Sequence, residues 1–518
     1  MAIRTISTLG GNYNSTTTWV GGIVPTAADD VVATGTSGPL TLVATGPVGG
    51  GVGYCKSLNL TGYVGILTIH ETLFVSGNVT LGSGMTFSTL STWYLNINAT
   101  SSITTNGIYI PNFTFSANIT ITLIDNLHIG KTFSVPAYNQ VTINNNNIYI
   151  HKDFYITYVG RLSGTAPLRF VGTGVFAGIG GIYDTIFSPV IIDSGSGTTT
   201  IVGEIAIGNS LVYVSGTVVK SGNVYLYITG ALTAVTINFS PIITWENISI
   251  TPTQTINILS DLYCNDLNLQ RPTLIGNNII IYRSFLSLGS KGTTKLIIAG
   301  TGTWITPDYY YFLENDLIIN TTGTFTLATP TTSYLNYSIG KITYISGTIV
   351  QNGTLNIITT ASFNTSGMSF TNLNITNGTI TLDSTLNVSN TLTLGSSGNV
   401  IFAGSSGFTT NILSVVPSNI RTITLKDSNT YTVNSALTFT GFGAGSRLSI
   451  ISSSSTVRAI FTLNPLATQI VTNTDAVRID SGFGQTIACG PTAVLVDTIN
   501  WYYPYSPSTG NFLTMFDN

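Results

Sequence analysis

A short apolar-x-apolar phrase recurs along the chain and constrains its fold more than any other feature. In each copy, one residue separates two apolar residues, and a turn residue follows a few positions later. Side chains two positions apart on a strand lie on the same face, so the phrase predicts short strands with one buried face. The clearest pairs are Leu58/Leu60, Leu67/Ile69, Leu73/Val75, Val79/Leu81, Ile248/Ile250, Ile256/Ile258, Leu262/Cys264, Leu267/Leu269, Leu373/Ile375, Ile380/Leu382, Leu386/Val388 and Leu392/Leu394.

Groups of these pairs recur about every 55–75 residues, which is typical of a solenoid whose units bury their apolar faces against each other. Composition agrees, because charged residues are only 7% of the chain, against roughly 25% in an ordinary globular protein. Thr, Ser and Asn, together with 54 Gly, form the polar surface and the turns. We therefore predict an all-β fold: a right-handed parallel β-helix (β-solenoid) with an N-terminal cap and a C-terminal β module.

The sequence suggests four regions. We assign residues 1–55 to the N-terminal cap and first coils, and residues 56–420 to the β-helical repeat. Residues 421–500 form a C-terminal β-repeat module, and residues 501–518 form an aromatic tail. The phase of the alternation predicts an inward set in the repeat, because a shift by one residue would turn it to solvent. That set contains Leu373, Ile375, Leu386, Val388, Leu392 and Leu394.

Residues 11–32 read as a cap for the first coil. Trp19 can cover the open end of the core, Gly21 and Gly22 allow a tight turn, and an Asp pair at 29–30 precedes the first strand. A solenoid needs such a cap because its terminal coil has an unpaired edge. This phrase resembles the opening of many bacterial and phage β-helical surface proteins. The resemblance implies architecture and no particular activity.

The C-terminal module has its own phrase. A Gly-Ser-Arg strand at 445–450 is followed by Asp475 and Asp480, a Gly-Gln-Thr-Ile strand at 484–487 and a closing Asn500-Trp501. It resembles a module of phage tail-associated and bacterial surface proteins built from β-helical repeats, although the usual acidic cluster is reduced here to two residues. The resemblance implies a β architecture and names no catalytic residue.

The last residues carry more aromatic surface than a free terminus needs. We expect them to be an assembly contact of a homo-oligomer, and trimers are the commonest arrangement among the phage fibres that the chain resembles. An aromatic run near residue 310 is a candidate glycan contact, although packing of a loop against the coil is the alternative. The assembly candidates are Trp501, Tyr502, Tyr503, Tyr505, Phe512 and Phe516, and the glycan candidates are Tyr309, Tyr310 and Tyr311.

Two acid pairs deserve comparison with glycoside hydrolases, which need two carboxyl groups about 5–9.5 Å apart. Glu314 and Asp316 would share one strand face, and Glu246 and Asp266 would stack on successive coils. The opposing interpretation is that these acids mark turns. We favour the latter and predict no catalytic residue.

The other chemistry-bearing residues also have a structural interpretation. The three histidines lie within repeat strands or at their ends, where a lone His is usually structural. Cys264 occupies an inward position of the repeat and should be a small buried hydrophobe. We therefore predict neither a cofactor nor a metal site.

Charge and hydropathy narrow the functional class. The 17 basic and 20 acidic residues form no run of like charges, which argues against nucleic-acid binding. No apolar run has the length of a membrane span, and residues 1–11 lack the apolar core of a signal peptide. We expect a structural virion protein, such as a tail fibre, spike or head appendage, whose partners are itself, other virion proteins and a host-surface glycan. The alternatives are a polysaccharide depolymerase tailspike and a secreted bacterial β-helical adhesin.

Overall fold

The computed structural model describes most of the chain, which divides into two compact units, residues 1–280 and 281–518. Nearly all described residues belong to strands or turns, and the described part has one short 3-10 helix, η1 (Thr16–Thr18). The described ranges are 2–42, 52–90, 94–116, 118–157, 160–179, 185–229, 234–251, 255–270, 272–287, 290–305, 311–328, 337–357, 360–395, 398–415, 421–442, 446–490 and 493–502.

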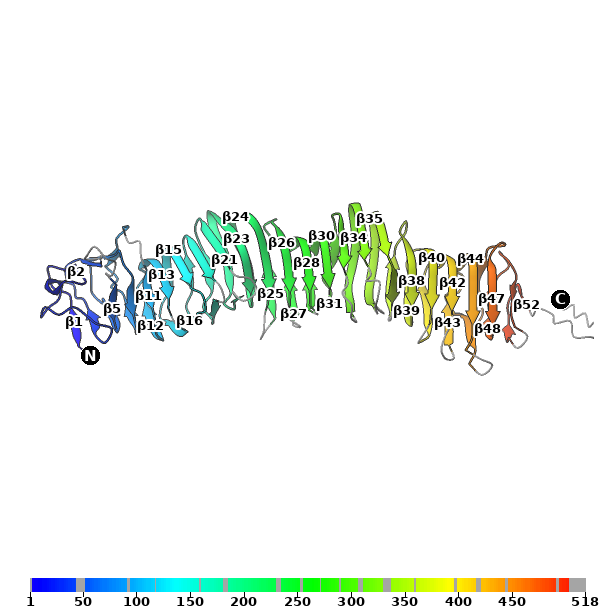
Figure 1. Cartoon of the computed structure of the whole chain (residues 1–518), viewed down its shortest axis with the longest axis horizontal. Helices are drawn as coiled ribbons and strands as arrows, with labels where there is room; N and C mark the ends of the chain where they lie inside the picture. Colours follow the sequence, from blue (N-terminus) through cyan, green and yellow to red (C-terminus); the bar gives the residue numbers. More distant parts are fainter. Residues whose placement is uncertain are drawn as a thin grey trace, which may run out of the picture. The chain divides into compact units, whose positions relative to one another are not determined.

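The first unit is a stack of parallel coils. Strands β8 (Leu73–Val75), β11 (Leu95–Ile97), β13 (Tyr109–Phe115) and β15 (Leu127–Val135) pair in parallel, each with the next, and Figure 1 shows the last three side by side. Their buried side chains continue one another from coil to coil. This inner row passes through Leu73, Leu95, Phe113, Phe133, Phe154, Phe176 and Ile201.

The second unit repeats the same principle. Strands β36 (Thr354–Ile357), β38 (Ser369–Ile375), β40 (Leu386–Leu394) and β42 (Phe408–Val415) pair in parallel order. Leu355 pairs with Leu373, and Leu373 pairs with Leu392, so the partners are 18 and 19 residues apart. The coil is thus much shorter than the 55–75-residue spacing of the similar phrases, which spans several coils.

The predicted inward set of the repeat is buried. Leu373, Ile375, Leu386 and Leu392 have no exposed surface, while Val388 and Leu394 are at most 2% exposed. Residues between them, such as Asn387, are only half-buried. The alternation therefore predicted the phase of these strands correctly, and the parallel β-solenoid is confirmed.

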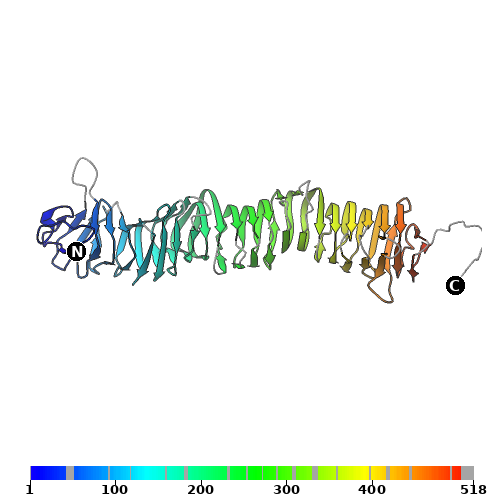
Figure 2. The same ribbon diagram turned by 60° about the horizontal axis from the view of Figure 1, so that its bottom comes forward.

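Several strands turn the corners of a coil without losing their hydrogen bonds. Strand β23 (Val190–Ile207) pairs with β20 (Leu168–Phe170), β21 (Gly174–Ile179) and β22 (Thr185–Ile186). Its register to β24 (Ser210–Ile228) shifts near Asp193 and again near Gly203, and these irregularities mark the corners. Figure 2 shows the faces of the coils from a second side.

The longer strands of each unit give the framework for the side chains considered below. In the first unit they also include β14 (Ile119–Leu123), β16 (Gln140–Asn145), β18 (Asp153–Thr157), β26 (Thr244–Ile250) and β28 (Leu262–Leu269). In the second unit they also include β34 (Tyr311–Ala328), β35 (Tyr337–Asn352), β39 (Gly378–Leu382), β41 (Val400–Gly404), β43 (Arg421–Leu425), β44 (Thr430–Thr440), β45 (Leu448–Ser452), β46 (Ala459–Leu463) and β47 (Thr468–Thr472).

The N-terminal cap is confirmed in the role of Trp19, but the Asp pair does not precede the first strand, because Asp30 begins the third strand, β3 (Asp30–Val32). Trp19 is buried, packs edge-on against Tyr13 with ring centroids 5.1 Å apart, and donates its indole N–H to the Tyr13 carbonyl at 2.8 Å. An antiparallel bridge between Ile6 and Trp19 covers the edge of the first strand, β1 (Ile3–Thr5). Gly22 adopts φ 69° in the turn that follows, a conformation that favours glycine. The cap therefore closes both the core and the open backbone edge.

The C-terminal module continues the coils and then closes them. Its strand β45 pairs with β43 and with β48 (Thr474–Val477). Arg447 forms an ion pair with Asp475 at 2.7 Å, so one of the two remaining acids of the phrase holds neighbouring coils together. A two-stranded sheet of β50 (Ile487–Ala488) and β52 (Trp501–Tyr502) ends the described chain. The boundaries of the four predicted regions stay predictions.

Candidate functional site

The predicted glycan contact lies largely outside the described residues. Tyr309 and Tyr310 are not described, and only the backbone of Tyr311 is, as the first residue of β34, where it pairs with Tyr337. A role for these rings in binding sugars therefore stays a prediction.

The predicted assembly contact is described only at its start. Trp501 is 7% exposed and donates its indole N–H to the Ser481 hydroxyl at 2.8 Å, so the chain itself uses this ring. Tyr502 is 47% exposed. The other four members of the set lie outside the described residues: Tyr503, Tyr505, Phe512 and Phe516. Assembly through this tail stays a prediction.

The first acid pair does not stack as the sequence suggested. Asp266 pairs in register with Asn247, and Glu246 instead accepts a hydrogen bond from the Asn265 side chain at 2.9 Å. The expectation that Glu246 and Asp266 occupy equivalent positions on successive coils was therefore wrong by one residue. The reason is coil length, because 19 residues separate register partners here and 20 separate the two acids.

The second acid pair is described only in part. Asp316 pairs in register with Lys341, whose ammonium lies 3.4 Å from the carboxylate of Asp383. The side chain of Glu314 lies outside the described residues. Asp316 therefore lies across from a lysine that forms an ion pair with another acid, and opposite charges on neighbouring strands stabilise a sheet.

Four outward-facing rings form a cluster on the first unit that the sequence interpretation missed. We call Tyr109, His128, Tyr149 and His151 the His–Tyr cluster. Tyr109 pairs in register with His128, and His128 pairs with Tyr149 of β17 (Ile148–Ile150). His151 directly follows β17 and therefore faces outward like Tyr149, two residues before it. Three adjacent coils thus contribute to one group of rings.

The rings of the His–Tyr cluster contact one another closely. His128 stacks on Tyr149 with ring centroids 4.7 Å apart and planes within 5°. Tyr109 lies against both imidazoles, with centroid distances of 5.0 Å to His128 and 4.7 Å to His151. The imidazole Nδ1 of His128 is 3.3 Å from Nε2 of His151, so one nitrogen donates a hydrogen bond to the other. These contacts hold the two imidazoles in a fixed mutual orientation.

Both imidazoles of the cluster favour the neutral form. Burial lowers the pKa of His128, and the Asp125 carboxylate opposes this in part. Burial also lowers the pKa of His151, and the neighbouring His128 adds to the effect. Each ring therefore keeps a nitrogen lone pair near neutral pH. The signal in the sequence was the spacing of Tyr109, His128 and Tyr149, which equals one coil at each step, but the sequence does not fix the coil length to the residue.

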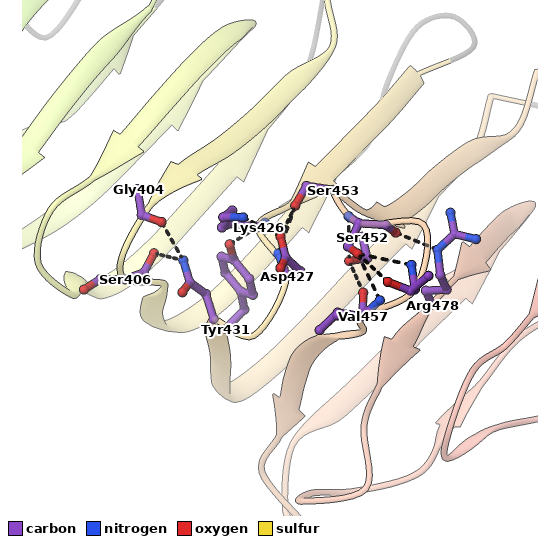
Figure 3. Close-up of polar contacts among 12 residues, drawn as sticks. Gly404, Ser406, Lys426, Asp427, Tyr431, Ser452, Ser453, Val457 and Arg478 are labelled. Atoms are coloured by element: carbon purple, nitrogen blue, oxygen red, sulfur yellow. Dashed lines mark hydrogen bonds and ion pairs between the residues drawn. The ribbon is translucent and has the colours of Figure 1, made fainter.

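A second polar group lies on turns of the second unit (Figure 3). We call Lys426, Asp427, Tyr431, Ser453 and Arg478 the turn cluster. Lys426 forms an ion pair with Asp427, and the Ser453 hydroxyl donates to the Asp427 carboxylate at 2.6 Å. The Asp427 backbone N–H in turn donates to the Ser453 oxygen at 3.0 Å. The Lys426 ammonium, followed by the Ser453 hydroxyl, holds the pKa of Asp427 below its usual value.

The remaining members of the turn cluster bind backbone groups. Tyr431 is fully buried and its hydroxyl accepts the Lys426 backbone N–H at 2.8 Å. Burial raises the pKa of this phenol to about 12, so it stays neutral. Arg478 donates to the Ser454 carbonyl at 2.8 Å. The Ser453 hydroxyl donates its proton to a carboxylate that already binds an ammonium, so no base activates this hydroxyl as a nucleophile. We therefore interpret the turn cluster as a structural brace that stabilises the turns.

The cysteines behave as the sequence predicted. Cys55, Cys264 and Cys489 are unpaired and buried. Burial raises the pKa of Cys55 and Cys489 to about 12 and raises that of Cys264 as well, so none is a reactive thiolate. Within the described ranges, no three His, Cys, Asp or Glu side chains gather as they would around a metal ion.

Comparisons with known proteins do not place this chain in a family. A scan against protein-family models, a search of curated proteins and a search of solved structures each found no significant match. The described part of the chain also contains no helix with the length and apolar character to cross a membrane. Any functional assignment therefore depends on the fold and on the surface that it presents.

Proposed function

We propose that this protein is a structural component of a virus particle, such as a tail fibre, a spike or a head appendage. The observation that carries the proposal is the stack of parallel coils in each unit. Each coil buries its apolar face against the coils beside it, so the interior is filled without a partner and the outer faces remain available for assembly and contact. The opening and closing phrases, which resemble those of phage and bacterial β-helical surface proteins, support the same class.

The outer faces support a role within an assembly. Charged residues are 7% of the chain, and outward amides such as those of Asn374 and Asn390 bind amides on a neighbouring coil. Asn374 donates to Asn356 at 2.8 Å, and Asn390 donates to Asn372 at 2.9 Å. A free monomer with so few charges would be poorly dispersed. We therefore propose that its partners are further copies of itself and other virion proteins.

Contact with a host-surface glycan is the second part of the proposal. A surface rich in amides, hydroxyls and tyrosines suits a neutral sugar chain, because such groups donate and accept hydrogen bonds without the desolvation cost of charges. In the turn cluster, the ammonium, the carboxylate and the hydroxyl already bind one another, so they do not form a catalytic acid and base. The outer surface of the coils therefore supports binding of a glycan more than its hydrolysis.

Particle localisation tests the proposal. Antibodies against the full chain are applied to purified particles of the virus from the same source and viewed by immunogold electron microscopy, with a gene-deleted particle as control. We expect label on a discrete appendage that the deleted particle lacks. Label confined to the surface of uninfected cells would instead identify an adhesin and contradict the proposal. Binding of the purified chain to host polysaccharide, scored with and without oligosaccharide release, tests the glycan step separately.

A further inference from the structure

We propose that His128 and His151 of the His–Tyr cluster bind a divalent first-row transition-metal ion, with Zn²⁺ as the reference case. The inference does not depend on the proposed virion function, because it concerns two side chains within the first unit.

The distance between the two nitrogens fits a shared metal ion. His128 Nδ1 and His151 Nε2 are 3.3 Å apart. Two imidazole nitrogens that bind one Zn²⁺ ion at about 2.0–2.1 Å, at tetrahedral positions, lie roughly 3.3–3.4 Å from each other. The distance between the nitrogens therefore needs little change, and each ring has to turn so that its lone pair points at the ion.

The surrounding rings hold this geometry before any metal arrives. His128 is stacked on Tyr149, and Tyr109 lies against both imidazoles. The two imidazoles are themselves stacked, with ring centroids 5.6 Å apart. Each side chain therefore loses little freedom on binding, which is the main cost of assembling a site from flexible surface residues.

Gly130 lies opposite His151 on the neighbouring coil. Ile150 pairs in register with Ile129, so the next position along the neighbouring strand is Gly130. A β-carbon built there would have only the Ile110 carbonyl oxygen within 4 Å, at 3.9 Å. The outer face at Gly130 is therefore open, next to the position that His151 takes on the adjacent coil.

The chemistry requires a change of tautomer. In the metal-free pair, one N–H donates to the other nitrogen, so both rings carry their proton on the same type of nitrogen: both on Nδ1 or both on Nε2. When metal binds, His128 must offer the Nδ1 lone pair and keep N–H at Nε2. His151 must offer the Nε2 lone pair and keep N–H at Nδ1. One ring therefore moves its proton between its own nitrogens, and no net proton is lost.

The local charge favours a cation. The Asp125 carboxylate acts electrostatically on His128 and would also attract a bound cation. Two protein nitrogens leave further coordination positions on the ion, and water or a donor from a partner molecule would fill them. Neutral imidazole is the form that binds Zn²⁺, and burial favours that form at both residues.

Zinc titration of the full chain tests the proposal. The metal-stripped protein and its His128→Gln and His151→Gln variants are titrated with Zn²⁺ by calorimetry in a non-chelating buffer, and Co²⁺ is followed by its visible absorption. His70→Gln is the matched control, because His70 is the third histidine of the chain and is not in the cluster. We expect one ion per chain, an affinity at least about 10-fold weaker in either cluster variant, and no change in the control.

A second variant separates loss of the site from loss of the fold. Gly130→Val leaves both histidines in place but adds a β-branched side chain, which suits a strand, at the open position opposite His151. We expect native circular dichroism together with an affinity about 10-fold or more below that of the unchanged protein. The proposal is overturned if the unchanged protein takes up no Zn²⁺, or if His70→Gln weakens binding as much as the cluster variants do.

Discussion

The His–Tyr cluster of the first unit and the turn cluster of the second unit use their polar groups in opposite ways. In the turn cluster, an ammonium, a carboxylate and a hydroxyl bind one another, and Tyr431 and Arg478 bind backbone groups. In the His–Tyr cluster, one N–H···N hydrogen bond joins the two imidazoles. When a metal ion replaces that hydrogen bond, one nitrogen of each ring can donate its lone pair to the ion. The same coil architecture thus supports a brace in one place and a candidate binding site in another.

The difference follows from where the chain places its polar residues. Lys426 and Asp427 are adjacent on the turn between β43 and β44, Tyr431 lies at the start of β44, and Ser453 reaches Asp427 from the next coil. His128 and His151 lie on different coils, and only stacking in register brings them together. The ion pair of the turn cluster therefore joins neighbours in the sequence, whereas the two imidazoles meet only because the coils stack.

The largest expected effect tests the phase on which both clusters depend. Leu386→Asp would place an unpaired charge in the dry interior, and we expect it to lower the free energy of unfolding by roughly 4 kcal/mol. Asn387→Asp, on the neighbouring half-buried position, should change it by less than about 0.5 kcal/mol. Denaturant unfolding followed by circular dichroism measures both. Equal effects would mean that inward and outward positions are wrongly assigned.

The next effect separates the two clusters by burial. Tyr431 is fully buried against Phe402 and Phe408, so Tyr431→Ala should cost about 3 kcal/mol, and Tyr431→Phe about 1 kcal/mol through the lost hydrogen bond. Tyr149→Phe, on the outer face of the first unit, should cost less than about 0.5 kcal/mol. The measurement is again chemical unfolding. A Tyr149→Phe change as costly as Tyr431→Phe would remove the distinction between brace and site.

The smallest effect concerns acid. The folded pKa of Asp427 is lowered, so its ionised form stabilises the fold at pH values above the unfolded pKa, and this contribution is lost as pH falls through the lower, folded pKa. The stability difference between the unchanged protein and Asp427→Asn should therefore be constant at neutral pH and shrink below about pH 4. Thermal unfolding of both proteins at several pH values measures it. A difference that grows on acidification would contradict the Lys426 and Ser453 contacts.

Much of the fold was predictable because the interior of a solenoid repeats a simple rule. The pairs around Leu373 and Leu386 alternate strictly, so their phase was evident from the sequence. The N-terminal cap was also predictable, because a tryptophan that can cover an open core is followed there by two glycines that allow a tight turn. The alternation along a strand carries no information on the handedness of the coils or on the boundaries of the four regions.

The candidate site was not predictable, because it depends on coil length. Asp266 pairs in register with Asn247, so Glu246 misses that position by one residue. Spacings of 19 and 21 residues, in contrast, place Tyr109, His128 and Tyr149 in one row across three coils. Coil lengths vary along this chain, and short sequence phrases do not fix them.

The most direct test of the account is the imidazole ¹⁵N spectrum of the protein labelled at histidine, which has only three such residues to assign. Without metal, we expect His128 and His151 to show the same tautomer and to be joined by an N–H···N hydrogen bond, with His70 independent. With one equivalent of Zn²⁺, His128 should carry its proton on Nε2 and His151 on Nδ1, while His70 stays unchanged. Two imidazoles that show no mutual hydrogen bond, and no change of tautomer with Zn²⁺, would contradict the in-register stacking that brings them together and the site inferred from it.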